Sequence, residues 1–138
     1  MRIAIIGGGL MGAGLAQLFA ARNHTVVVVE PFERAREAIP AKIAAICDTV
    51  GESTGCTRRV FCHAELTAIS DADFVIEAAP EKVELKQELF AKLLNVAAPH
   101  AVLGTNSSVI PVSVVTQRLS DEQAARVVGT HFWNPPYL

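Results

Sequence analysis

The sequence has no excess of positive charge and few aromatic residues. Its 12 Lys and Arg residues stand against 14 Asp and Glu residues, which gives a net charge of −2. A protein that binds nucleic acid needs a basic surface, and one that stacks bases needs aromatic side chains, which are only 6% of this chain. No apolar run reaches the roughly 20 residues of a membrane span. We therefore expect neither nucleic acid nor a membrane as a partner.

Cysteine is also scarce, with three residues at Cys47, Cys56 and Cys62. Their odd number and irregular spacing do not form a disulfide framework, which favours reduced thiols and a cytoplasmic location. A zinc site would need His63 as a further ligand, and the sequence has neither a Cys-x-x-Cys nor a His-x-x-x-His pair. We expect no metal site.

Hydrophobic residues, in contrast, make up 51% of the 138 residues, which is enough for one packed domain. Short apolar runs alternate with longer stretches of helical periodicity, a pattern typical of a parallel sheet with helices on both faces. The run 25–29 is β-branched and apolar almost throughout, so we expect both of its faces to be buried. The sequence therefore predicts a doubly wound α/β fold with a mostly parallel sheet over residues 1–138.

The pattern also predicts the individual elements. We expect strands at 2–6, 25–29, 60–61, 73–78, 101–104 and 127–129. We expect helices at 10–22, 33–47, 81–98 and 111–117, and a loop at 51–57. Pro40 should break or bend the second helix. The third helix carries charged residues that we expect on its solvated face: Glu84, Lys86, Glu88 and Lys92.

A glycine motif follows the first predicted strand. The segment Gly7-Gly8-Gly9-Leu10-Met11-Gly12 matches G-x-G-x-x-G and opens a predicted helix, which is the context the motif requires. Gly7 should allow the tight turn, Gly9 the approach of a pyrophosphate, and Gly12 close packing of helix on strand. The free N–H groups of Leu10, Met11 and Gly12 should face the phosphates at the positive end of the helix dipole. The motif favours a Rossmann-type, dinucleotide-binding fold over a glycine-rich turn without a ligand.

An acidic residue ends the second predicted strand. Glu30 lies where a carboxylate accepts hydrogen bonds from the adenosine ribose hydroxyls, and a carboxylate there repels a 2′-phosphate. Pro31 and Phe32 follow it, so no Arg stands next to the acid. We predict NAD as the cofactor, although Arg34 and Arg36 are close enough to leave NADP open.

Polar residues follow two later strands. Ser108 comes after the strand that ends near Gly104, and His131 and Asn134 follow the last strand. Because the carboxyl ends of parallel strands face the ligand crevice, we expect these groups beside the nicotinamide. His131 is suited to remove a hydroxyl proton, while Ser108 and Asn134 could orient the oxygen.

Each of these residues also has a simpler interpretation. Asn106 or Ser107 could cap the following helix, and Asn134 could shape a turn before Pro135. A Ser-His hydrolase is less favoured, because Ser108 lacks the Gly-x-Ser-x-Gly context of a nucleophile elbow.

Taken together, the motifs resemble the NAD-binding N-terminal domain of the L-3-hydroxyacyl-CoA dehydrogenases. The similarity runs from Arg2 to Tyr137. The segments that carry it are Gly7-Gly8-Gly9-Leu10-Met11-Gly12, Asp73-Phe74-Val75-Ile76-Glu77-Ala78-Ala79-Pro80-Glu81, Thr105-Asn106-Ser107-Ser108 and His131-Phe132-Trp133-Asn134-Pro135.

This resemblance implies roles for single residues. His131 matches the base that takes the proton of the 3-hydroxyl, Ser108 the serine that binds the substrate oxygen, and Asn134 an asparagine beside the nicotinamide. Glu81 and Lys86 match an acid and a lysine near the nicotinamide ribose. Composition alone would make them a first-turn acid and a solvated lysine. We also expect cofactor contacts from Ala79 and Asn106.

The chain departs from the family in ways that affect the expected function. The family pairs its histidine with a later glutamate and has a second, helical domain for substrate binding and homodimer formation, and the sequence ends before either. The segment between Glu30 and Asp73 is shorter than the hairpin that many members use for coenzyme A. We predict an oxidoreductase domain of fatty acid metabolism that binds NAD but turns over poorly alone. The alternatives are a dehydrogenase of free hydroxy acids, as with gulonate or carnitine, and a non-catalytic NAD-binding module.

Overall fold

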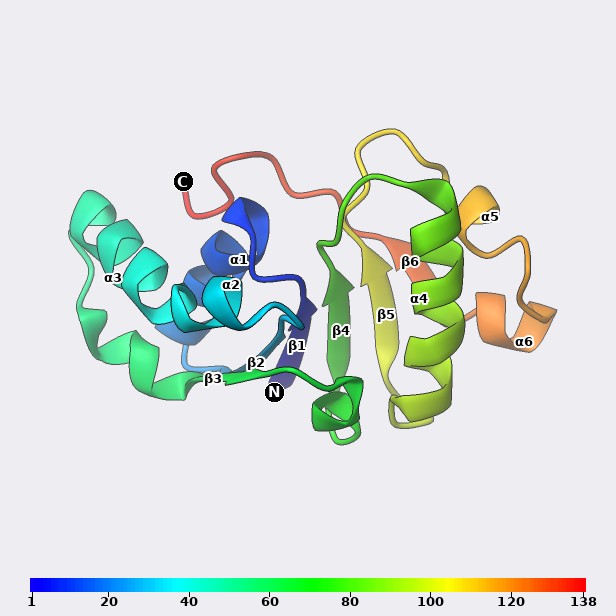
Figure 1. Ribbon diagram of the computed structural model, residues 1–138, viewed down its shortest axis with the longest axis horizontal. Helices are drawn as coiled ribbons and strands as arrows, with labels where there is room; N and C mark the ends of the chain where they lie inside the picture. The colour runs from blue at the N-terminus through cyan, green and yellow to red at the C-terminus, as the bar shows by residue number, and fades with distance from the viewer.

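The computed structural model describes residues 1–138 and contains one six-stranded sheet in which all neighbouring strands are parallel. The strand order is β3-β2-β1-β4-β5-β6 (Figure 1). The strands are β1 (Arg2–Ile6), β2 (Thr25–Val29), β3 (Val60–His63), β4 (Phe74–Glu77), β5 (Val102–Thr105) and β6 (Val127–Gly129). The direction of strand order reverses between β1 and β4, and this point is where ligands bind in open parallel sheets.

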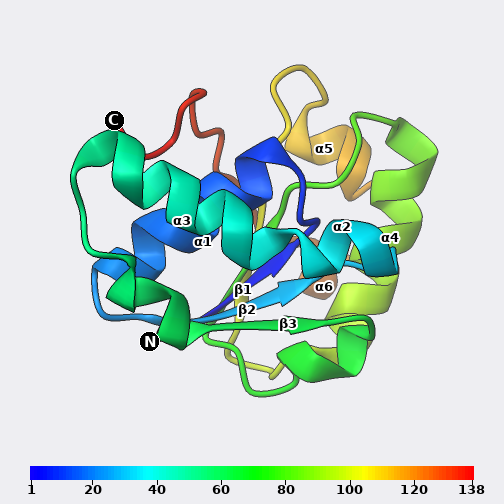
Figure 2. The same cartoon turned by 60° about the vertical axis from the view of Figure 1, so that its left-hand side comes forward.

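Helices cover both faces of the sheet (Figures 1 and 2). The α-helices are α1 (Leu10–Ala21), α2 (Glu33–Glu37), α3 (Ile39–Val50), α4 (Val83–Val96), α5 (Val112–Val115) and α6 (Asp121–Ala124), and the 3-10 helices are η1 (Thr54–Arg59) and η2 (Leu66–Ile69). None of them combines the length and the apolar character needed to cross a membrane.

The strands alternate between two hydrophobic cores. In β1, Ile3 and Ile5 face a cluster with Leu15 of α1 and Ile43 of α3. Ala4 and Ile6 face the opposite cluster, which contains Phe90 and Leu93 of α4 and Val115 of α5. Because the central strands β1, β2 and β4 are buried on both faces, continuous apolar runs such as 25–29 are required there. The predicted Rossmann-type fold is confirmed.

Several predicted boundaries are wrong. The helix predicted at 33–47 is two helices, which meet at Ala38, and α3 continues to Val50. Pro40 lies in the first turn of α3. A backbone N–H at this position would have no acceptor within the helix, so proline loses no helical hydrogen bond there. The segment 51–57 is not all loop, because η1 begins at Thr54. The short turns η2 and α6 were not predicted, since four residues carry too little periodicity to read.

The helix predicted at 81–98 begins two residues later, at Val83. Glu81 therefore lies in the loop before α4 and is not a first-turn acid. Lys86 does not lie on the solvated face, because it is only 1% exposed. Glu84, Glu88 and Lys92 are exposed, as expected.

Candidate functional site at the carboxyl edge of the sheet

The turn between β1 and α1 depends on two of its glycines. Gly7 adopts φ of 108°, and a Cβ there would come within 2.8 Å of the Ala78 carbonyl oxygen in the neighbouring loop. A Cβ on Gly12 would lie 1.8 Å from the Gly7 carbonyl oxygen, so any side chain at this position would push the helix away from the turn. These contacts fit the packing roles predicted for Gly7 and Gly12.

The third glycine faces open space. A Cβ on Gly9 would meet no atom within 4 Å. The first helical hydrogen bond runs from the Ala13 N–H to the Gly9 carbonyl, so the N–H groups of Leu10, Met11 and Gly12 have no partner in the chain. An open surface lined by free amides at a helix N-terminus fits the pyrophosphate of a dinucleotide.

Glu30 lies beneath the glycine turn and is 8% exposed. Its carboxylate accepts the Gly8 N–H at 2.9 Å and the Phe32 N–H at 3.1 Å. These bonds fix the acid and leave its remaining lone pairs for a ligand. Arg36 donates to the backbone carbonyls of Glu30 and Pro31, at 2.9 and 3.3 Å, so its guanidinium is already bound to the chain.

Ser108 and His131 meet across the edge of the sheet. Ser108 Oγ and His131 Nε2 are 2.9 Å apart, within hydrogen-bond distance, although Ser108 follows β5 and His131 follows β6. Both side chains are exposed. They line a pocket of about 530 Å³ with Met11 of α1, Asn106 and Asn134. The structure thus brings these five predicted residues together.

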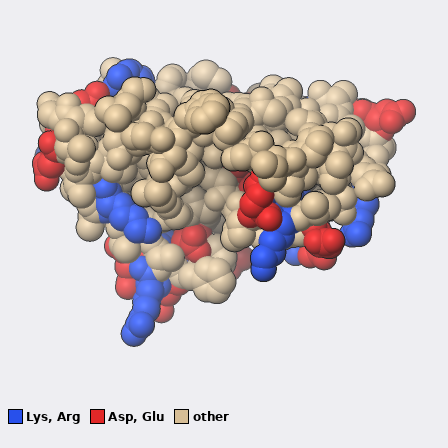
Figure 3. All heavy atoms as spheres, turned by 90° about the horizontal axis from the view of Figure 1, so that it is seen from above, with Lys and Arg blue, Asp and Glu red and all other residues tan.

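The surface around this pocket is largely uncharged. Figure 3 looks down on this face and shows mostly uncharged atoms, with most charged side chains toward one margin. Three apolar side chains are exposed there: Leu10 at 67%, Val109 at 77% and Trp133 at 81%. Trp133 also lies against the His131 ring, with centroids 5.5 Å apart.

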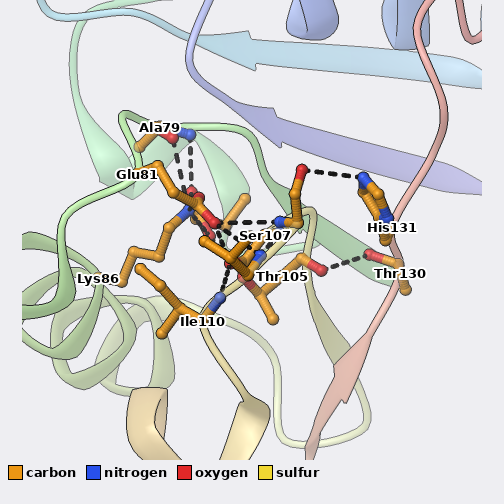
Figure 4. A network of polar contacts seen from close by, with 11 residues as sticks. Ala79, Glu81, Lys86, Thr105, Ser107, Ile110, Thr130 and His131 are labelled. Carbon is orange, nitrogen blue, oxygen red and sulfur yellow. Dashed lines mark hydrogen bonds and ion pairs between the residues drawn. The ribbon is translucent and has the colours of Figure 1, made fainter.

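Glu81 holds the loop that carries Ser108 (Figure 4). Its Oε1 accepts the Ser107 hydroxyl and the N–H groups of Ser108, at 3.0 Å, and Val109, at 3.2 Å. Burial raises the pKa of the Glu81 carboxyl, but the Ser107 and Val109 hydrogen bonds and the nearby Lys86 ammonium outweigh it and lower the pKa to about 2. Glu81 is therefore ionised at neutral pH.

Lys86 is buried below Glu81 and paired with a second acid. Its Nζ lies 2.7 and 2.8 Å from the two carboxylate oxygens of Glu77, which is 0% exposed, and 3.2 Å from Glu81 Oε2. It also lies 3.4 Å from the Ala79 carbonyl oxygen. The ammonium group therefore has protein acceptors for its donors, and the N–H and carbonyl of Ala79 both bond within the same network.

The sequence matches the family model described as "3-hydroxyacyl-CoA dehydrogenase, NAD binding domain" over residues 2–138. The chain belongs to this family. A 3-hydroxyadipyl-CoA dehydrogenase of Escherichia coli K12 is 36% identical, over 96% of this chain and 29% of its own length. The mitochondrial hydroxyacyl-coenzyme A dehydrogenase of Rattus norvegicus is 31% identical, over 96% of this chain and 46% of its own.

Solved structures agree with this assignment. The crystal structure of a 3-hydroxybutyryl-CoA dehydrogenase from Escherichia coli K12 matches with a TM-score of 0.89 and 33% identity, over 99% of this chain and 30% of that one. The NAD-binding domain thus spans less than half the length of these relatives. Its cofactor is NAD, as the sequence predicted.

Sequence reasoning missed some residues that build the edge. Glu77 and Thr105 end their strands and bond to each other, at 2.8 Å, below the site. Phe32 is 74% exposed beside Glu30, and Lys42 Nζ donates to the Gly8 carbonyl at 3.0 Å. The sequence offered one signal for them. Glu77 is an acid at the end of the apolar run of β4, and a buried charge there needs a partner of opposite charge.

Proposed function

We propose that the protein carrying this NAD-binding domain oxidises an L-3-hydroxyacyl-CoA reversibly to the 3-oxoacyl-CoA, with NAD as the hydride acceptor. The observation that supports it most is the 2.9 Å contact between Ser108 Oγ and His131 Nε2 in a pocket also lined by Met11 of the glycine turn. A hydroxyl, an imidazole and the dinucleotide turn are what alcohol oxidation by hydride transfer requires.

The glycine turn would hold the cofactor. The free amides of Leu10, Met11 and Gly12 would bind the pyrophosphate, which would occupy the open space next to Gly9. The Glu30 carboxylate would accept the adenosine ribose hydroxyls and repel a 2′-phosphate. The Arg36 guanidinium, which is bonded to backbone carbonyls, is poorly placed to offset that repulsion. We therefore propose selectivity for NAD over NADP.

His131 would act as the base. NAD, when bound, accepts the hydride from the carbinol carbon. His131 Nε2 takes the hydroxyl proton as the carbonyl forms, and returns it in the reverse reaction. Ser108 Oγ would hydrogen-bond the same oxygen and orient it toward His131, and Asn134 would hold the nicotinamide in the pocket. Glu81 would act near the nicotinamide ribose, and Asn106, whose Oδ1 accepts the Phe132 N–H at 2.7 Å, would shape the pocket wall.

The rest of the protein is also part of the proposal. A helical domain outside residues 1–138 would cover the exposed apolar rim of Leu10, Val109 and Trp133, complete the substrate cleft and form a homodimer. The three free cysteines fit a reducing compartment, and we propose the cytoplasm. Similar proteins include peroxisomal and mitochondrial ones, so localisation by fluorescence microscopy would test this.

The test is NADH formation at 340 nm by the full-length protein. We expect turnover of 3-hydroxybutyryl-CoA with NAD, little with NADP, and little of free 3-hydroxybutyrate. Higher kcat/KM for the free acid would favour the hydroxy-acid alternative. NAD binding without turnover of either would favour a non-catalytic module. The 138-residue chain alone should bind NAD but turn over slowly, because no carboxylate within it contacts His131.

A further inference from the structure

The buried Glu77 contacts three segments that build the site. Its carboxylate accepts the Ala79 N–H at 2.7 Å, the Thr105 hydroxyl at 2.8 Å and the Lys86 ammonium. Its backbone carbonyl accepts the Asn106 N–H at 2.9 Å. One buried acid thus connects the end of β4, the start of α4 and the end of β5.

Lys86 connects Glu77 to Glu81. The Lys86 side chain is 1% exposed, and its ammonium contacts Glu77, Glu81 and the Ala79 carbonyl. Its positive charge lies between two carboxylates. Within the chain, Lys86 therefore reaches the loop after β5 through Glu81.

Glu81 in turn fixes the loop after β5. The Ser107 hydroxyl and the N–H groups of Ser108 and Val109 all meet one oxygen of this acid, and Figure 4 shows the contacts running on to His131. The polar contacts therefore form an unbroken path from Glu77 to Ser108.

We propose that Glu77 is a positioning residue that sets the place of Ser108 relative to His131 through Lys86 and Glu81. The step that needs this is substrate orientation, so the inference rests on the proposed function. The simpler explanation is that Glu77 and Lys86 neutralise each other and only stabilise the fold. A buried ion pair is often replaced by uncharged residues with little loss of stability, whereas removal of one partner is costly.

That difference gives the experiment. The variants of the full-length protein are Glu77→Gln, Lys86→Met, the double variant Glu77→Gln/Lys86→Met, Glu81→Gln, and the double variant in the Glu81→Gln background. Lys92→Met on the exposed face of α4 is the matched control. The measurements are the thermal midpoint, amide hydrogen exchange at Ser108 and Val109, and kcat with KM for NAD and substrate.

We expect the double variant to recover most of the thermal midpoint that each single variant loses. It should nevertheless exchange at Ser108 and Val109 about tenfold faster than the wild type and lose about tenfold to hundredfold in kcat, because Glu81 has lost its anchor. In a Glu81→Gln background the double variant should add much less to either readout than it does alone, since only the branch through Thr105, whose hydroxyl oxygen accepts the Ser107 N–H at 3.3 Å, then still joins Glu77 to the loop. Lys92→Met should match the wild type throughout.

Wild-type exchange and wild-type kcat in the folded double variant would overturn the proposal. An effect of the double variant that is as large in the Glu81→Gln background as it is alone would also overturn it, and this comparison remains measurable even if one single variant fails to fold. If the wild-type protein itself oxidises no hydroxyacyl-CoA, the proposed function fails, and hydrogen exchange still decides whether Glu77 positions the loop.

Discussion

At the scale of single residues, the proposed base His131 and the proposed oxygen-binding group Ser108 follow different strands. Ser108 and His131 are 23 positions apart, and neither side chain is buried. Packing therefore does not fix this pair, and its geometry comes from the loop anchors. Exposed residues that are held by loops can be changed with little effect on stability.

His131→Gln should therefore remove chemistry without removing the fold. We expect kcat to fall by about 10²- to 10⁴-fold, the usual contribution of a general base. NAD affinity, measured by calorimetry, should stay within about twofold, because the amides that we propose to bind the phosphates lie on α1. His100→Gln, at the opposite end of the sheet beside Asp73, is the control and should keep wild-type turnover. An unchanged kcat in His131→Gln would show that His131 is not the base.

The glycine turn offers a second residue-scale prediction. Gly12→Ala should destabilise the domain by about 3 kcal/mol or more, because its Cβ would overlap the Gly7 carbonyl at 1.8 Å. Gly9→Ala should keep the midpoint of urea unfolding, since its Cβ meets nothing within 4 Å, yet weaken NAD binding about tenfold or more. If Gly9→Ala bound NAD as tightly as the wild type, the pyrophosphate would not lie over Gly9.

Only part of the residue-scale site could be predicted from the sequence. The glycines and Glu30 were readable because their spacing follows from backbone geometry in a local motif. Lys86 was placed on the solvated face because of its charge, although it shares the helical spacing of Phe90 and Leu93 on the buried face of α4. Its charge is compensated by Glu77, an acid on another element, and such a tertiary pairing cannot be read from the local sequence.

At the scale of elements, the loop 106–110 depends on one ionised acid in the preceding crossover. The pKa of Glu81 is lowered from 4.5 to about 2 in the folded protein. A carboxyl with a lowered folded pKa stabilises the fold above its unfolded pKa, and that contribution is lost as pH falls through the folded value. Glu81 should therefore contribute fully above about pH 4.5 and progressively less down to pH 2.

Glu81→Gln tests this dependence. The thermal midpoint of the variant should be lower than that of the wild type at pH 7, and the gap should narrow between pH 4.5 and pH 2. Because the Glu81 side chain is 37% exposed, solvent screens the effect, and we expect a small shift. Glu84→Gln, an exposed acid on α4, is the matched control and should show no such convergence. A constant gap across this range would mean that ionisation of Glu81 does not hold the loop.

The elements themselves were predictable where one physical signal dominated. Strands buried on both faces are continuously apolar, so 25–29 was placed with the correct bounds. Pro40 indicated a break, but the break falls at Ala38, because proline suits the first turn of the next helix. The turn η1 was missed, since its six residues contain Gly55 and little apolar periodicity.

At the scale of the whole molecule, the C-terminal segment crosses back over the sheet. It leaves β6 on the α4 side and ends against α1 on the other side (Figure 1). Phe132 packs edge-on against Phe19 of α1, with ring centroids 6.1 Å apart. Pro136 and Tyr137 pack against Gly14, where a Cβ would lie 2.7 and 3.3 Å from their side chains. This crossing is what brings His131 and Asn134 over the glycine turn.

Gly14→Ala should therefore disturb catalysis, although Gly14 does not line the pocket of Ser108 and His131. Its Cβ would overlap the rigid Pro136 ring at 2.7 Å and move the crossing segment, costing about 1–3 kcal/mol of stability. We expect kcat to fall more than NAD affinity, since the segment carries His131 while the amides of α1 stay in place. Gly55→Ala, whose Cβ meets only Ser53 Oγ at 3.3 Å, is the control. Equal losses of kcat and NAD affinity in Gly14→Ala would show that α1 itself moves, and that the crossing segment does not position the base independently.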